Sequence, residues 1–190
     1  MSIKFLLHVC CAPCSIAIID ELHKKFDLSV FFYNPNIHPE EEYLKRKNEV
    51  IKVCQEWGVP MFDCDHIELE KPFDSKNIVY DEKKWHEVVK GLEKEPEMGA
   101  RCPVCFRMRL EKTADYAAKN NFDIFGTSLT TGRNKKSDVI HPIGLAVAKK
   151  YNLKFYEEDW KKGGRQEKGR KMISDRNIYR QDYCGCVYSK

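Results

Sequence analysis

Two glycine-rich motifs with which α/β proteins commonly bind nucleotides are missing from this 190-residue chain: it has neither G-x-G-x-x-G nor G-x-x-x-x-G-K-[ST]. Those loops hold pyrophosphate with backbone N–H groups, so a dinucleotide-binding enzyme is not expected. The chain also has no apolar run near the roughly 20 residues that cross a bilayer, and its first residues lack the apolar stretch of a signal peptide. We therefore expect a cytoplasmic protein that does not bind membranes.

The composition predicts a folded globule with reduced cysteines. Hydrophobic residues make up 42% of the chain and charged residues 33%, which is typical of globular proteins. At this length one domain over residues 1–190 is expected. Because the cytoplasm keeps thiols reduced, the nine cysteines, an odd number, are interpreted as ligands or catalytic groups rather than as disulfide bonds.

Short apolar segments alternate with segments of helical periodicity along the chain. Strands are predicted at residues 3–9, 28–33, 59–63, 122–126 and 153–156. Helices are predicted at residues 15–26, 40–57, 81–92, 103–120 and 141–151. This alternation indicates an α/β fold: a Rossmann-like three-layer sandwich with a mainly parallel five-stranded sheet. Ligands of such folds bind beyond the carboxyl ends of the strands.

Seven of the nine cysteines fall into three groups. They are Cys10, Cys11 and Cys14 in the turn after the first strand, Cys102 and Cys105 at a helix start, and Cys184 and Cys186 near the C-terminus. Thiolates are the ligands that zinc and iron-sulfur clusters prefer, and a helix N-terminus lowers a thiol pKa. The remaining two, Cys54 and Cys64, are interpreted as structural.

Two kinds of protein fit these cysteines. A zinc-stabilised RNA-binding module needs only four thiolates, so seven favour an iron-sulfur redox enzyme with thiols to spare. Cys184 and Cys186, separated by one glycine, can form a strained disulfide, and such disulfides are redox-active. Both interpretations stay open at this point.

Basic charge is concentrated in the cysteine-containing segment 160–190, which has nine Lys or Arg and three acidic residues. This suits an anionic partner such as nucleic acid, although a solvated basic surface explains it equally well. The candidate phosphate-binding residues are Lys161, Lys162, Arg165, Arg170, Lys171, Arg176 and Arg180.

Four segments resemble the successive signatures of the QueH type of epoxyqueuosine reductase. They are L-H-V-C-C-A-P-C-S at 7–15, Y-N-P-N-I-H-P at 33–39 followed by Glu42, Tyr43 and Arg46, R-C-P-V-C-F-R-M-R-L at 101–110, and Y-R-Q-D-Y-C-G-C-V-Y-S at 179–189. The resemblance implies a nucleotide alpha-hydrolase (HUP) type of fold. It also implies the last step of queuosine formation, which removes the epoxide oxygen of epoxyqueuosine in the anticodon loop of tRNA.

The same resemblance implies a [4Fe-4S] cluster held by Cys10, Cys11, Cys102 and Cys105, with Cys184 and Cys186 as a redox-active pair. Cys14 either replaces one of these ligands or helps to bind a second, mononuclear iron or zinc ion. The expected partners are tRNA bearing epoxyqueuosine and an electron donor, and the chain is expected to act as a monomer. The candidates for the acid that protonates the epoxide oxygen are Tyr183, Asp182, His8 and His38.

Two further features bear on this resemblance. Many relatives have a Ser-Pro-x-Lys-like segment where this chain has T-T-G-R-N-K-K at residues 130–136, so substrate contacts in that loop are not transferred. A rival, an iron-sulfur tRNA thiolation enzyme, shares the fold but activates its substrate with ATP. It should have a glycine- and serine-rich loop where this chain has C-C-A-P-C.

Overall fold

The computed structural model describes residues 2–63 and 82–189. Within them, five parallel strands form one sheet in the order β3-β2-β1-β4-β5. The strands are β1 (Lys4–Val9), β2 (Asp27–Phe32), β3 (Met61–Asp63), β4 (Ile124–Thr127) and β5 (Lys154–Phe155). This is the strand order of a Rossmann-like doubly wound sheet, so the predicted fold class is confirmed.

The strand order reverses between β1 and β4: successive strands are added on one side of β1 up to β3 and on the other side from β4 onward. β1 pairs with β2 on one side, in register from Lys4 opposite Asp27, and with β4 on the other side, ending at His8 opposite Thr127. Helices therefore leave the carboxyl ends of β1 and β4 toward opposite faces of the sheet. A crevice at this switch point is where such folds bind their ligands.

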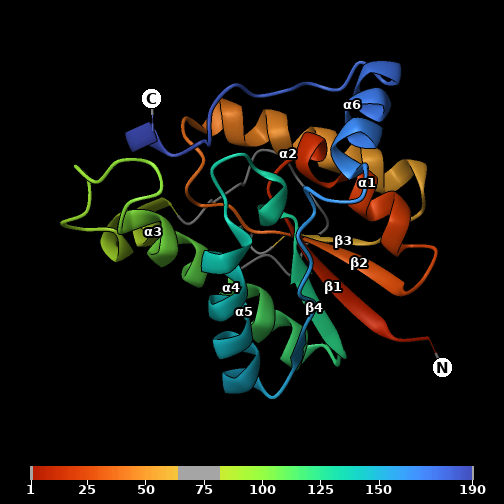
Figure 1. Ribbon diagram of the computed structural model, residues 1–190, viewed down its shortest axis with the longest axis horizontal. Helices are drawn as coiled ribbons and strands as arrows, with labels where there is room; N and C mark the ends of the chain where they lie inside the picture. The colour runs from red at the N-terminus through yellow and green to blue at the C-terminus, as the bar shows by residue number, and fades with distance from the viewer. Residues whose placement is uncertain (1, 64–81, 190) are drawn as a thin grey trace, which may run out of the picture.

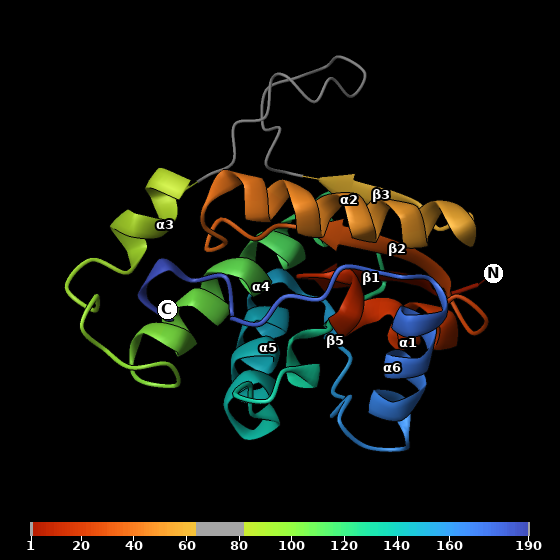
Figure 2. The same cartoon turned by 90° about the horizontal axis from the view of Figure 1, so that it is seen from above.

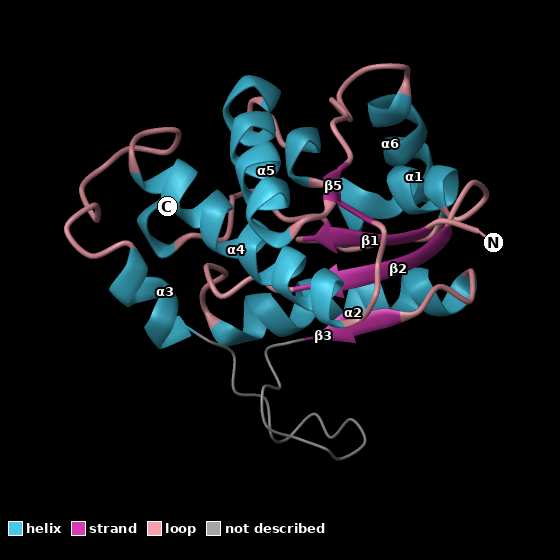
Figure 3. Cartoon of the chain, turned by 90° about the horizontal axis from the view of Figure 1, so that it is seen from below, coloured by secondary structure: helices cyan, strands magenta, loops and turns pink. Residues whose placement is uncertain are grey.

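Helices cover both faces of the sheet (Figures 1 and 2). Three helices lie on one face: α1 (Ala12–Leu22), α2 (Glu40–Glu56) and α6 (Arg165–Asp175). Two lie on the other: α4 (Arg101–Lys119) and α5 (Ser137–Tyr151). The short α3 (Glu82–Val88) lies beside the start of α4 (Figure 3). None of the described helices combines the length and apolar character needed to span a membrane.

Each central strand contributes to two apolar cores. Phe5, Leu7 and Val9 of β1 point into the core beneath α1 and α2, whereas Leu6 points into the core beneath α4 and α5. A strand that is buried on both faces reads as a continuous apolar run. This explains why the strands were predictable from composition alone.

The structure adds one helix to those predicted and corrects the bounds of several others. Helix α1 ends at Leu22 rather than at residue 26, and α3 ends at Val88 rather than at residue 92. Helix α6 was not predicted, since residues 160–190 were interpreted only as a basic segment. α1 begins at Ala12 rather than at residue 15, because Cys11 is extended and Pro13 fits the first helical turn. α5 begins at Ser137 rather than at residue 141. Cys54 is buried as expected, and Cys64 lies outside the described residues.

We expect opposite effects on stability from adding one methyl group to two helical glycines. A Cβ at Gly144 in α5 would overlap the ring of Phe155, whereas a Cβ at Gly169 in α6 would lie 3.7 Å from that of Ala17, an ordinary contact. Gly144→Ala should lower the free energy of unfolding by about 1–3 kcal/mol through overpacking. Gly169→Ala should raise it by about 0.5–1 kcal/mol. Urea unfolding measures both, and equal effects would contradict this packing.

The contact between α1 and α6 should depend on pH. Hydrogen bonds from Arg165, and to a smaller extent from Lys25, lower the pKa of Glu21 from 4.5 to about 2, although burial opposes this. A lowered pKa stabilises the folded state fully above pH 4.5, and that contribution disappears as the pH falls toward 2. Glu21→Gln should therefore cost about 1 kcal/mol at pH 7 and less at pH 3. The exposed Glu87→Gln variant is the control, and a pH-independent loss would contradict the ion pair.

Candidate metal centre and adjoining pocket

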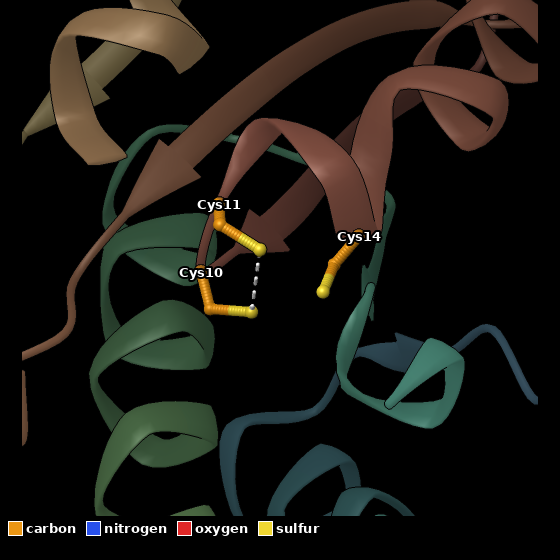
Figure 4. A group of neighbouring side chains, drawn as sticks. All are labelled: Cys10, Cys11 and Cys14. Atoms are coloured by element: carbon orange, nitrogen blue, oxygen red, sulfur yellow. Dashed lines mark hydrogen bonds between the residues drawn. The ribbon is translucent and has the colours of Figure 1, made fainter. Parts of the chain in front are cut away.

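Three cysteines converge where β1 meets α1. Cys10 follows the last residue of β1, Cys11 immediately precedes α1, and Cys14 lies in its first turn. Their sulfur atoms lie within 4.8 Å of one another, and those of Cys10 and Cys11 are 3.9 Å apart (Figure 4). Because parallel strands end at one edge, these thiols lie at the switch point of the sheet, where the fold positions a ligand.

The thiols of this group differ in pKa. Hydrogen bonds from Cys11 and Cys14 lower the pKa of Cys10, and the positive charges of Lys135 and Arg109 act in the same direction, although burial opposes them. Burial and the hydrogen bond to Cys10 raise the pKa of Cys11. One thiolate is thus favoured without a metal, and a bound cation would displace the remaining protons.

Cys102 and Cys105 lie at the start of α4, as predicted, although the helix begins at Arg101 rather than at residue 103. Among the described residues they are not part of the group within 4.8 Å. Cys102 packs against the same apolar cluster as Cys10 and Cys11, whereas Cys105 is buried beside Trp85 and Cys186. The four predicted cluster ligands are therefore divided between the turn before α1 and the start of α4.

N–H groups point at the sulfur atoms of three of the four predicted cluster ligands. The Gln181 side-chain amide donates to Cys11 Sγ at 2.8 Å. The Met98 backbone amide donates to Cys102 Sγ at 3.2 Å, and the Trp85 indole to Cys105 Sγ at 3.4 Å. Such donors stabilise thiolate ligands and tune the potential of iron-sulfur centres. The donor set and its surroundings therefore fit a bound cluster.

Two buried cations lie close to the thiols. Burial by itself lowers the pKa of Lys135, but Cys184, Cys10 and Cys14 more than offset it, so the net effect is a raised pKa. Arg109, which is 1% exposed, donates to Asn34 Oδ1 at 3.2 Å and to Asn36 Oδ1 at 2.9 Å. These cations favour negative charge on sulfur or on a bound ligand.

A pocket of about 480 Å³ adjoins the centre, with Cys14 and Cys184 among its lining residues. Its walls come from the start of α1, the loop 131–135, α6 and residues 180–184. Four predicted phosphate-binding residues line it: Lys161, Arg165, Arg170 and Arg180. Arg133, which was not predicted, lines it as well.

The other three basic residues do not line this pocket in the described part of the chain: Lys162, Lys171 and Arg176. Arg176 instead forms an ion pair with Glu56 at 2.7 Å. Arg165 lines the pocket but is also paired with Glu21 at 2.7 Å and with Glu158 at 3.2 Å. The basic segment is therefore divided between the pocket and the outer surface of the helices.

The comparison with known proteins gives a consistent result. The family model for "Epoxyqueuosine reductase QueH" matches residues 5–190. Relatives with that name come from Histophilus somni (41% identity over 98% of this chain and 72% of the relative), Acinetobacter baylyi (41%, 98% and 80%) and Thermotoga maritima (36%, 97% and 88%). This chain belongs to the epoxyqueuosine reductase QueH family.

The comparison with solved structures gives weaker evidence than the comparison with sequences. The U34-tRNA thiolase NcsA from Methanococcus maripaludis, described with its [4Fe-4S] cluster, is similar over 92% of this chain and 66% of its own. The sequence identity is 12% and the TM-score is 0.44. Similarity at this level supports no transfer of function or ligands, so membership of the QueH family rests on the sequence relatives.

The C-terminal segment of this QueH-family chain runs from the end of α6 to the C-terminus (Figure 1), and its Gln181 contacts the thiol centre at Cys11. Arg46 of α2, which is 2% exposed, donates to the carbonyl oxygen of Cys184 at 3.1 Å and to that of Tyr183 at 3.2 Å. Gly185 has a φ of +102°, and a Cβ there would lie 2.9 Å from Ile37. This glycine lets Cys184 line the pocket while Cys186 packs beside Trp85, and both thiols are free.

The four candidate acids have different surroundings. His8 is fully buried between Thr127 Oγ1 at 2.9 Å and the carbonyl oxygen of Tyr33 at 3.2 Å, and burial lowers its pKa to about 3. It is therefore a neutral residue of the sheet. Tyr183 and Asp182 line the pocket, and the Tyr183 hydroxyl donates to the carbonyl oxygen of His38.

Three polar residues at the centre had no role in the sequence analysis: Gln181, Lys135 and Arg109. Gln181 lies within the C-terminal QueH signature, and Lys135 lies in the loop 130–136, from which the sequence analysis transferred no substrate contacts. The sequence therefore drew attention to both segments, but it could not show which distant thiols Gln181 and Lys135 contact. Arg109 belongs to the third signature, where its burial could not be distinguished from surface exposure.

Proposed function

We propose that this chain reduces epoxyqueuosine to queuosine in the anticodon loop of tRNA, using a [4Fe-4S] cluster held by Cys10, Cys11, Cys102 and Cys105. The observation that carries the proposal is the position of the thiol centre beside a pocket with basic walls, in a member of the QueH family. Cys14, which lies both in the thiol group and in the pocket wall, is available to a cluster iron or to a second ion.

Opening an epoxide to an alkene consumes two electrons and two protons and releases the oxygen as water. A bound cluster would supply electrons singly. Oxidation of Cys184 and Cys186 to a disulfide yields two electrons and two protons, which matches the requirement. An external donor would then reduce this disulfide.

The residues around the pocket have roles in this scheme. Lys135 carries a buried positive charge that can stabilise negative charge developing on the epoxide oxygen. Asp182 and Tyr183 lie in the wall beside Cys184 and can exchange protons with a bound substrate. Burial raises the pKa of Tyr183, so its hydroxyl group keeps its proton at neutral pH.

The basic wall is the proposed contact with tRNA phosphates. Arg170, Arg180 and Arg133 are exposed and line the pocket, as does the half-buried Lys161. Phosphate contacts of this kind orient a nucleic acid, while the unpaired base is held in the pocket. The expected compartment is the cytoplasm, where tRNA and a thiol-reducing environment coincide, and the expected active form is a monomer.

A tRNA thiolation activity is not favoured. It would require a loop that binds the pyrophosphate of ATP at the start of α1. In this chain the extended Cys11 and Pro13 occupy that position, and the turn from Cys10 to Cys14 has no glycine. The site thus presents sulfur atoms where phosphate would need N–H groups.

Cysteine variants test the cluster. Cys11→Ser or Cys105→Ser should lose iron and acid-labile sulfide from protein purified without oxygen, because each removes a thiolate. Cys184→Ala should keep the iron and the acid-labile sulfide. With a chemical reductant as electron source, however, this variant should no longer reduce epoxyqueuosine in tRNA. Cys54→Ala, a change of a buried thiol in α2, is the matched control that should keep iron, sulfide and turnover. Zinc without iron or sulfide in the wild-type protein would contradict the proposal.

Arginine variants test the tRNA surface. Arg170→Ala and Arg180→Ala should each weaken tRNA binding by about tenfold and reduce the salt dependence of log Kd by about one unit, as expected for one lost phosphate contact. Arg176→Ala is the control, since this exposed arginine pairs with Glu56 instead. Filter binding at several salt concentrations measures the effect. Equal losses in all three variants would show that the pocket wall has no special role.

A further inference from the structure

A second group of metal-ligating side chains lies outside the thiol centre. It consists of His38, in the loop after β2, and of Glu82 and His86, one turn apart on α3. Their ligand atoms all lie within 4.8 Å of one another. Glu82 Oε1 is 3.1 Å from His38 Nδ1 and 3.6 Å from His86 Nε2, so one carboxylate oxygen lies near a nitrogen of each imidazole.

The geometry suits a single small cation. Zinc and similar ions bind histidine nitrogen and carboxylate oxygen at about 2.0–2.2 Å, which separates tetrahedral ligands by about 3.4 Å. The two measured separations lie on either side of that value. Glu82 and His86 are both partly exposed, so a fourth position would be open to water, which is the pattern of a three-ligand site.

Surrounding side chains orient both imidazole rings. The Tyr188 hydroxyl lies 3.4 Å from His86 Nδ1, which directs Nε2 toward Glu82. The Trp85 ring packs against His38, at 5.3 Å between centroids, and stacks with Tyr188 at 5.9 Å. A hydrogen bond to the second nitrogen of a ligating histidine is the usual support of a metal site. A simple ion pair between His and Glu on the surface does not require this additional hydrogen bond to the imidazole ring.

We infer that His38, Glu82 and His86 bind one divalent transition-metal ion of the zinc type. The site uses nitrogen and oxygen ligands and none of the thiols of the centre. Such ligands accept zinc and ferrous iron as single ions, whereas thiolates bind iron-sulfur clusters as well as zinc. The two centres therefore differ in that only the thiols have the ligands for an iron-sulfur cluster.

The position of this ion suggests what it does. The His38 backbone amide donates to the carbonyl oxygen of Gly185 at 2.8 Å, and Tyr188 lies three residues further along the same segment. The ion thus joins α3 to the segment that carries Cys184 and Cys186. This consequence rests on the proposed function, in which those thiols react, whereas binding of the ion does not.

Cobalt(II) is the probe, because its visible spectrum reports its ligands. The full chain with iron loaded into the thiol centre is titrated with cobalt(II) under anaerobic conditions, and difference spectra are recorded. One cobalt per chain should bind, with visible d–d bands and no thiolate-to-cobalt charge-transfer band. Cobalt should also raise the melting temperature.

Glu82→Gln and His86→Ala should lose the bands and the thermal shift, while Glu87→Gln on the same helix keeps both. His86→Cys should bind cobalt and gain the charge-transfer band, which guards against a variant that merely fails to fold. No uptake, a charge-transfer band in the wild-type chain, or uptake that survives His86→Ala would overturn the inference. Iron content and epoxyqueuosine reduction are measured separately, so failure of the proposed function is distinguishable from failure of this site.

Discussion

The ammonium group of Lys135 is buried near thiols that come from distant parts of the chain. Cys10 and Cys14 belong to the turn between β1 and α1, and Cys184 belongs to the C-terminal segment. A buried lysine is costly unless negative charge lies nearby. Cys10, whose pKa Lys135 helps to lower, therefore depends on the loop after β4: without the cation its thiolate loses stabilisation, and without a thiolate the cation loses a partner.

The same dependence explains why the C-terminal segment lies where it does. Arg46 holds the backbone at Cys184, and Gln181 donates to Cys11 across 170 residues of sequence. Several of the hydrogen bonds that hold the segment are accepted by its backbone carbonyl oxygens. These bonds depend on the backbone conformation of the segment rather than on its side chains. The thiols at its end are consequently positioned by α2 and by the loop that contains His38.

The sheet and most helices could be predicted because their information is local. A few neighbouring residues are enough to identify the apolar run of β1 or the helical periodicity of α2 and α4. Helix α6 could not, since it is largely polar, with Met172 and Ile173 as the hydrophobic residues that pack on the core. The thiol groups were visible as motifs, but Lys135 and Gln181 become part of the site only through long-range packing.

The turn between β1 and α1 shows that the same position in a fold can bind ligands of opposite charge in different proteins. In Rossmann-like proteins this edge presents backbone N–H groups and the positive end of a helix, which together favour anions. Here sulfur atoms are inserted in front of that helix end, so the edge favours cations instead. The basic side chains that line the adjoining pocket lie elsewhere, on the loop 131–135, on α6 and on the C-terminal segment. In the proposed function, electron transfer and polynucleotide binding therefore use different walls of one pocket.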